Sequence, residues 1–519
     1  MRAHHAHTRG RIFDNHKPNM KLLRIILSAA ALLSAFSDLS AGITFRRAPQ
    51  YSQDTVYSNR YYVVCITDPG NLAAINGEQV KVYKTGTFGR QLKLVEGDNP
   101  VEITLFQGKN VETRQFSIHY KPREVNPAPE PEPVEEARLF YVETKENAYL
   151  QYGSGTDRLG GSKMGYLDPG IVLKVVGTVG DLYKVQLSSN RYAYIHIEDV
   201  EFTPRSSHVV NTNNIGISDV GGCDRIRLAL PEKLPYASFT SLDPTTITVE
   251  VFGAMNNSNW VTQYNDLGMV DYLDLRQAES DVLRLVIKLK EKYCWGYRIR
   301  YDGSALVIEV RHSPKELSLK GLKIGLDAGH GGELPGAIST TGIKESEINL
   351  KIVKEIQKLL ENKGARVVLS RSKDVNLTMP ERKQIFRDAD IDLLVSIHNN
   401  AGGSPLNPMG TSTYYKHITN RDLAATLLKH MLELGVPRYG LVGNFNFSLN
   451  APTEYPNALV ECLFMSSLPD EEMLADPATP RVIAGKVVDG IEEYLQKVAQ
   501  AEGKTDTNTG KNKKKGGKR

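Results

Sequence analysis

GLKIGLDAGHGGELPGAISTTG, residues Gly321–Gly342, joins an apolar, strand-like run to a turn in which glycines surround His330. The amphipathic segment ESEINLKIVKEIQKLLENKG follows the turn, and its pattern predicts a helix that ends at Gly364. From Leu322 onward, strand-like and helix-like segments alternate in this way. Such alternation predicts an α/β domain over residues 321–499, with a mostly parallel sheet flanked by helices.

The rest of this domain continues the alternation. Further strands are expected at ARVVLSR, IDLLVSIHNNA, GTSTYYKH and NALVECLF, and further helices at PERKQIFRDAD, RDLAATLLKHMLELG and PRVIAGKVVDGIEEYLQKVAQA. Ligands of such sheets bind beyond the carboxyl ends of the strands. Polar side chains at those ends are therefore the first candidates for a functional site.

Small all-β domains are expected upstream, because short alternating runs are separated by turn residues there. The Asn-Gly pair in INGEQ predicts a β-hairpin. Residues 43–120 resemble an Ig-like β-sandwich, 138–203 an SH3-like β-barrel, and 204–316 a β-rich wall-targeting module. A Pro/Glu-rich stretch at 121–137 predicts an extended linker. Residues 500–519 end in GKNKKKGGKR and are expected to form a disordered basic tail.

The N-terminal region predicts export. Residues 20–42, MKLLRIILSAAALLSAFSDLSAG, have the basic start, apolar centre and small-residue end of a signal peptide. We expect the preceding residues 1–19 to be a misread extension rather than a His-rich metal tract. No cysteine lies near the cleavage region, and no later run reaches membrane-spanning length, so no stable membrane anchor is expected. The protein is therefore predicted to be periplasmic or secreted.

Charge and cysteine content exclude some classes of protein. The 519 residues carry a net charge of only +4, without the dense basic face of a nucleic-acid binder. The four cysteines include no CxxC pair, which argues against a thiolate zinc site. Cys223 and Cys294 fall in one predicted domain, so they form either a disulfide or two of four free thiols.

The glycines around His330 do not fit a phosphate loop. A dinucleotide fingerprint runs directly into a helix, but here the helix begins only near Glu345, and no GKS or GKT follows. A metal site is the alternative. His330 and His398 both follow strand ends, and Glu345 lies on the same helix face as the buried Ile348 stripe, whereas Glu347 faces solvent.

Two imidazoles and one carboxylate form a standard catalytic zinc set with water as the fourth ligand. A plainer interpretation also stands, in which the histidines are only hydrogen-bonded and Glu345 is a helix-capping charge. Glu461 interrupts the apolar strand NALVECLF. It is either a paired buried acid or a general base beside the metal.

The motifs IGLDAGHGG, GIKESEINL, VSIHNNA and ALVECLFMSS resemble those of type-3, zinc-dependent N-acetylmuramoyl-L-alanine amidases. The resemblance covers about residues 321–499 and implies one Zn²⁺ held by His330, Glu345 and His398, with Glu461 as the catalytic glutamate. The pair Ser370-Arg371 and the run ERKQIF also resemble family positions. Division-regulated members carry an inhibitory helix between the second histidine and the glutamate. The segment here fits only a strand, one helix and a loop, so no such helix is expected.

The resemblance implies hydrolysis of the amide between N-acetylmuramic acid and L-alanine in peptidoglycan, with the upstream modules holding the enzyme on the wall. Two other hypotheses stay open at this point. One is a zinc peptidase that cuts within the stem peptide, and the other is a wall-binding protein with a degenerate catalytic domain. Neither a regulatory protein nor an oligomeric state follows from the sequence.

Overall fold

The computed structural model describes residues 42–47, 55–123, 135–157, 159–243 and 245–503. The predicted signal peptide up to residue 41, the N-terminal residues 1–19, most of the predicted linker and the basic tail from residue 504 lie outside the described residues. Within the described ranges, no helix is both long and apolar enough to cross a membrane.

The first part of the chain, up to residue 123, is built from two facing sheets. Their shared core contains Val63, Ile75, Phe88 and Ile103, all fully buried. The predicted Asn76-Gly77 hairpin is confirmed, since both residues have positive φ between β4 and β5. One sheet has the order β1-β3-β6 and the other β2-β8-β7-β4-β5. Their strands are β1 (Thr44–Arg47), β2 (Thr55–Val56), β3 (Arg60–Ile66), β4 (Leu72–Ile75), β5 (Glu78–Val80), β6 (Thr87–Lys93), β7 (Gly97–Gln107) and β8 (Asn110–Tyr120).

Residues 135–203 form one antiparallel seven-stranded sheet in the order β11-β10-β14-β13-β12-β9-β15. Its register shifts between Val175 and Gly177, and such bulges bend a sheet so that it can enclose its own core. β9 begins at Glu135, inside the stretch predicted as linker. The elements are β9 (Glu135–Thr144), β10 (Tyr149–Asp157), β11 (Gly160–Tyr166), β12 (Val172–Val179), β13 (Leu182–Ser188), β14 (Arg191–His196), the 3₁₀ turn η1 (Ile197–Asp199) and β15 (Val200–Phe202).

Residues 210–311 form a second pair of sheets, in the orders β22-β17-β18-β26-β25 and β19-β20-β24-β23. The four cysteines of the chain are free, so the Cys223–Cys294 disulfide alternative is not what the structure shows. The strands are β16 (Val210–Asn211), β17 (Ile215–Asp219), β18 (Cys223–Leu228), β19 (Tyr236–Ser241), β20 (Thr246–Phe252), β21 (Ala254–Met255), β22 (Val261–Gln263), β23 (Val270–Glu279), β24 (Val282–Leu289), β25 (Tyr297–Asp302) and β26 (Ala305–Arg311).

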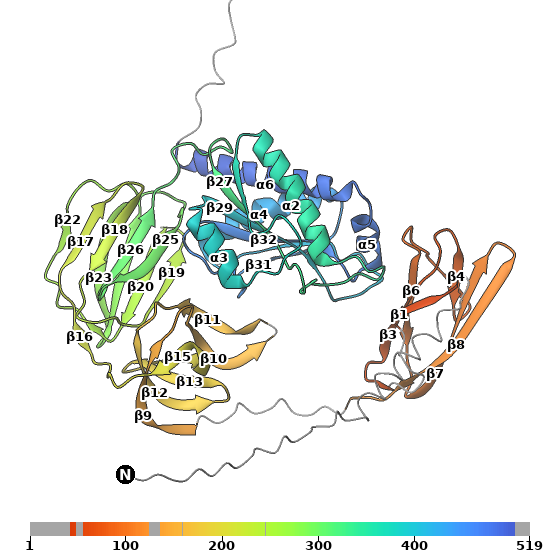
Figure 1. The fold of residues 1–519 in the computed structure, drawn as a ribbon, viewed down its shortest axis with the longest axis horizontal. Coiled ribbons are helices and arrows are strands. Elements are labelled where there is room, and N and C mark those ends of the chain that lie inside the picture. Colours follow the sequence, from red (N-terminus) through yellow and green to blue (C-terminus); the bar gives the residue numbers. More distant parts are fainter. Residues whose placement is uncertain (1–41, 48–54, 124–134, 158, 244, 504–519) are drawn as a thin grey trace, which may run out of the picture.

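The C-terminal domain is α/β, as the alternation predicts (Figure 1). Its sheet has the order β28-β27-β29-β32-β30-β31, and every neighbouring pair is parallel except β30 with β32. The elements are β27 (Lys323–Ala328), α2 (Glu345–Asn362), β28 (Arg366–Leu369), α3 (Met379–Asp388), β29 (Leu393–Asn400), β30 (Thr411–Tyr414), η2 (Ile418–Asn420), α4 (Arg421–Met431), η3 (Leu432–Leu434), β31 (Arg438–Val442), β32 (Asn457–Phe464), α5 (Leu468–Leu474) and α6 (Thr479–Ala501).

Both faces of this sheet are covered. In β29, Leu393, Val395 and Ile397 belong to the core that α2, α4 and α6 close, whereas Leu394 packs with Phe386 of α3 on the other face. A central strand buried on both faces is expected to be mostly apolar rather than alternating. The run LLVSI in β29 has this mostly apolar pattern. Between His398 and Glu461, a segment the structure describes completely, α4 is the only α-helix, and it packs on β30, β32 and α6.

Candidate metal centre

His330 lies just beyond the end of β27, in a turn that a side chain rarely adopts. Its φ is 60°, and the following Gly331 and Gly332 have φ values of 140° and 57°. Two buried arginines fix this turn through its carbonyl groups. Arg371 donates to the carbonyls of Ala328 and Gly329 at 2.8 and 2.9 Å, and Arg382 donates to that of His330 at 2.8 Å. The imidazole is thus presented from a rigid strand end.

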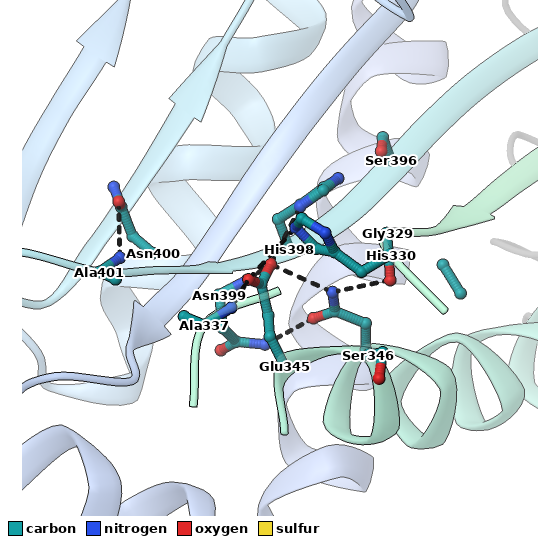
Figure 2. A network of polar contacts seen from close by, with 12 residues as sticks. Gly329, His330, Ala337, Glu345, Ser346, Ser396, His398, Asn399, Asn400 and Ala401 are labelled. Carbon is teal, nitrogen blue, oxygen red and sulfur yellow. Dashed lines mark hydrogen bonds and ion pairs between the residues drawn. The ribbon is translucent and has the colours of Figure 1, made fainter. Parts of the chain in front are cut away.

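Glu345 is the first residue of α2 and points inward, with only 4% of its surface exposed. Its Oε1 lies 3.0 Å from Nδ1 of His398, and its Oε2 lies 3.3 Å from Nε2 of His330. Backbone N–H groups of Ala337 and Asn399 donate to the same carboxylate. Figure 2 shows the carboxylate of Glu345 beside the two imidazoles, where several contacts of this network meet. Glu347 is exposed, as the helical period predicts.

The charge on Glu345 is strongly stabilised. Burial raises the pKa of a carboxyl group, but hydrogen bonds and attraction from His330 and His398 outweigh burial and hold the pKa of Glu345 far below its usual range. The opposite balance applies to His398. Burial lowers its pKa, whereas the hydrogen bond to Glu345 and the charges of Glu345, Glu461 and Asp327 raise it above the ordinary value. The three side chains therefore share one electrostatic environment that favours a cation.

His398 closes β29, and its ring meets two others. The centroid of the His330 ring lies 5.0 Å away and that of the Phe447 ring 5.6 Å away, both edge-on. The Nε2 atom of His398 is buried and has no hydrogen-bond partner among the described residues. A buried imidazole nitrogen without a partner is costly unless something binds it. A metal ion at this point would satisfy it.

The donor set fits one zinc ion. One ligand atom from each of His330, Glu345 and His398 lies within 4.8 Å of the others. Two histidines and a carboxylate are a catalytic zinc set. Gly336 keeps the space clear, because a Cβ there would lie 2.5 Å from Oε2 of Glu345 and 2.7 Å from the His330 ring.

Glu461 lies on the neighbouring strand. β32 pairs with β29 so that Glu461 is the register partner of His398, and the negative charge of Glu461 contributes to the raised pKa of that histidine. Glu461 is half-buried, while the strand residues on either side of it, Val460 and Cys462, are fully buried. The sheet thus brings the fourth predicted residue to the rim where the other three meet.

A buried ion pair between β27 and α3 lies next to the site. Arg382 lies 2.6 Å from Oδ1 of Asp327, and both side chains are only 1% exposed. Ser396 donates to the other carboxylate oxygen at 2.6 Å. Burial raises the pKa of Asp327, but the charges of Arg382 and His398 and the hydrogen bond from Ser396 hold it below its usual range. Arg382 therefore links the centre of the sheet to the His330 turn.

Several of the residues in these contacts could not be predicted from the sequence. Nothing in the sequence marks Asn349 and Asn399, which hydrogen-bond to each other at 2.8 Å and both contact Glu345. Gly336 and Phe447 lie in irregular loops, where spacing gives no orientation. Arg371 and Arg382 do lie in family-like motifs. Strand β27 ends next to the acidic Asp327, and the need of this acid for a basic partner could have indicated their role.

The described residues contain two other groups that could approach a metal. In one, Asp224 accepts hydrogen bonds from the backbone N–H groups of Gly268, Met269 and Val270, and lies 2.9 Å from Nε2 of His312. That carboxylate is saturated by the fold. The other group combines His430, Glu433 and Asp489 at an exposed helix surface, where both acids already form ion pairs with Lys486.

With this geometry established, comparison with known proteins is informative. Residues 324–493 match the family model described as N-acetylmuramoyl-L-alanine amidase. The match covers the α/β domain and all four predicted site residues, and it leaves out the upstream sheets. The similarity to this family therefore lies in the domain that holds the centre and does not extend to the upstream sheets.

Individual proteins are also similar to part of this chain. The probable cell wall amidase LytH of Staphylococcus aureus is 34% identical over 184 residues, which are 34% of this chain and 60% of LytH. The chain thus spans about three-fifths of the length of that curated relative. Among solved structures, the catalytic domain of the amidase CwlV from Bacillus (Paenibacillus) polymyxa var. colistinus is 29% identical, with a TM-score of 0.32 over 34% of this chain and 98% of that one. The amidase AmiC2 of Nostoc punctiforme is 28% identical, with a TM-score of 0.33 over 36% of this chain and 99% of that one.

Proposed function

We propose that the α/β domain hydrolyses the amide bond between N-acetylmuramic acid and L-alanine in peptidoglycan, with one zinc ion as cofactor. The observation that carries the proposal is the convergence of His330, Glu345 and His398 beside Glu461, inside the region that matches the amidase family model. LytH, which is 34% identical over 184 residues, is named a probable cell wall amidase, and this supports the substrate class.

Each site residue has a task in this reaction. His330, Glu345 and His398 would hold the ion. A bound Zn²⁺ supplies a Lewis acid that polarises a carbonyl group and makes a water molecule acidic at neutral pH. Glu461 accepts the proton of the attacking water and then donates it to the departing amine of L-alanine. Arg371 and Arg382 keep the His330 turn in place by binding its carbonyl groups.

The upstream domains are proposed to hold the enzyme on the cell wall. Residues 43–120, 138–203 and 204–316 are proposed to be an Ig-like sandwich, an SH3-like barrel and a wall-targeting module. The paired sheets in the first and third and the single curled sheet in the second support this division. Residues 20–42 are proposed to direct export to the periplasm or outside the cell, where peptidoglycan is accessible.

A zymogram on purified sacculi tests the proposal. The full-length protein should clear the sacculi, lose this activity with a chelator, and regain it with added zinc. The matched variant Glu461→Gln should stay inactive even with zinc. Clearing that persists in chelator would reject the metal-dependent reaction. Products cut within the stem peptide would reject the amidase in favour of a zinc peptidase.

A further inference from the structure

A cavity of about 510 Å³ lies where three parts of the chain meet. Its wall is formed by residues of the 135–203 sheet around Tyr166, by the end of the 210–311 region around Arg298, and by α3 and the loops around Lys416 in the α/β domain. Figure 1 shows the β10–β11 hairpin extending from its sheet toward the α/β domain. None of the four predicted site residues lines this cavity.

Lys383 and Lys416 line the cavity, Lys163 of β11 lies beside them, and all three lysines are half-buried. Lys383 of α3 lies 4.3 Å from the centre of the Tyr166 ring. Lys416 donates to the carbonyl of Lys163 at 3.4 Å and to Oδ1 of Asn446 at 3.2 Å. Lys163 itself lies 4.7 Å from the centre of the Tyr149 ring. Aromatic faces and neutral oxygens surround these three cations, and within the described part of the chain none of them forms an ion pair.

Clustering these cations is unfavourable in the free protein. Burial, followed by the charge of Lys163, lowers the pKa of Lys416 to about 8. Burial is also the main cause that lowers the pKa of Lys383, to which Arg387 and Lys163 add. An anion at this point would relieve the repulsion and raise the pKa of both lysines.

Three of the four acids that line the cavity are already engaged, and the fourth, Glu146, is exposed to solvent. Glu454 pairs with Arg387 at 2.7 Å. Glu381 accepts hydrogen bonds from Thr378 in the capping box of α3. Asp168 accepts the backbone N–H of Tyr301 at 2.7 Å. Because these acids have their own partners, the excess positive charge of the lysines stays available to a ligand.

The lysine cluster and the metal centre share two structural elements. On α3, Arg382 binds the carbonyl of His330, and the next residue, Lys383, belongs to the cluster. In the loop after β31, Phe447 meets the ring of His398, and the preceding Asn446 binds Lys416 and donates to the carbonyl of Gly161 in β11. α3 and the loop after β31 therefore connect the lysine cluster to the metal centre.

We propose that this cavity binds carboxylate groups of the peptide attached to the scissile amide, through Lys383 and Lys416 together with Lys163 of the β10–β11 hairpin. The proposal rests on the proposed amidase function and adds that the enzyme selects acidic stem peptides. It also gives the 135–203 domain a direct part in substrate binding, because that domain supplies one cation and the Tyr166 ring.

Equilibrium binding to the full-length protein tests this inference without any turnover. The probes are the peptide L-Ala–D-Glu–L-Lys and the same peptide with its carboxylates amidated, measured by calorimetry. The wild type should bind the acidic peptide about tenfold more tightly than the amidated one, as expected for charge-assisted hydrogen bonds. Lys383→Gln and Lys416→Gln should each remove most of this preference. Lys354→Gln, an exposed change on α2, should leave it intact.

The charge-preserving variant Lys383→Arg, together with thermal unfolding of each variant, separates loss of charge from loss of fold. Equal affinity for the two peptides, no binding of either, or an unchanged preference in both Gln variants would overturn the inference. Failure of the amidase function gives a different result. If the peptide preference follows the lysines but no muramyl amide is cut, the carboxylate site stands and only the proposed function is rejected.

Discussion

Nδ1 of His398 lies 3.0 Å from Oε1 of Glu345, although 53 residues separate them in the chain. One residue ends a central strand and the other begins a helix, and both side chains are buried. Burying an acid and an imidazole together without further function would cost stability. We propose that the pair forms two ligands of one cation, which leads to the following predictions.

Removing one imidazole should remove the metal. His398→Ala takes away a ligand and leaves Glu345 with a single histidine partner, so the purified variant should contain far less than one zinc per chain. Elemental analysis of protein purified with zinc gives the stoichiometry. The exposed His208→Ala is the matched control and should keep the wild-type metal content. A zinc-loaded His398→Ala protein would show that the ion binds elsewhere.

Glu461→Gln should separate binding from catalysis. The amide keeps the size of the side chain but cannot accept a proton, so kcat should fall by about 10²- to 10⁴-fold. The zinc content should stay at the wild-type value, because the three ligands are untouched. Steady-state kinetics on a soluble muramyl peptide measures the first effect. A variant that retains wild-type kcat would remove Glu461 from the mechanism.

Gly336→Ala should weaken metal binding through direct contact. The new Cβ would meet Oε2 of Glu345 and the ring of His330, and Gly336 also has a φ of +71°. Gly342→Ala is the control, since Gly342 has a φ of +94° but open space around it. Both changes carry a backbone cost of about 1 kcal/mol. Zinc affinity, measured by competition with a chelator, should fall only in Gly336→Ala, and equal affinities would contradict the assigned contact.

Asp327→Asn should destabilise the α/β domain. It leaves the Arg382 guanidinium buried without its anion, a loss of about 3–5 kcal/mol. Asp388→Asn on the exposed end of α3 should change the free energy of unfolding by less than about 0.5 kcal/mol. Because the pKa of Asp327 is depressed in the folded state, its contribution is present above the unfolded value and is lost as pH falls. Urea unfolding of the two variants at pH 7 measures both changes in the free energy of unfolding.

The pH dependence of stability should include His417. Burial lowers the pKa of this histidine to about 4, against the opposing hydrogen bond to the carbonyl of Ala451. Between about pH 6.5 and pH 4 the unfolded chain binds a proton that the folded chain does not, so stability is full above this window and falls within it. From pH 7 to pH 5 the wild type should lose about 2 kcal/mol more than His417→Gln. Parallel losses in the two proteins would mean that His417 does not titrate in this way.

The fold of the C-terminal domain follows from sequence because its signals are local. IDLLVSIHNNA has the pattern of a strand buried on two faces, and ESEINLKIVKEIQKLLENKG has that of a helix buried on one face. The structure has β29 and α2 at these places. The inward direction of Glu345 could be predicted for the same reason, since a helix fixes the angle between Glu345 and Ile348. Convergence at one rim then follows from the parallel order of the strands.

What could not be predicted depends on loops and on contacts between domains. β31 and α5 are short elements in stretches without a clear period, and no strand or helix is predicted at either place. Phe447 reaches His398 from an irregular segment, so no spacing rule places it. The contact between Lys416 and the carbonyl of Lys163 joins residues 253 positions apart, and only the packing of two domains brings them together.

Hydrolysis of a defined muramyl peptide by the zinc-loaded, full-length protein, followed by mass spectrometry of the products, tests the central claim most directly. The account predicts two products: a muramic acid with a free lactyl carboxylate, and a peptide with a free L-alanine amine. A cut at any other bond, or an intact substrate despite one bound zinc per chain, would contradict it.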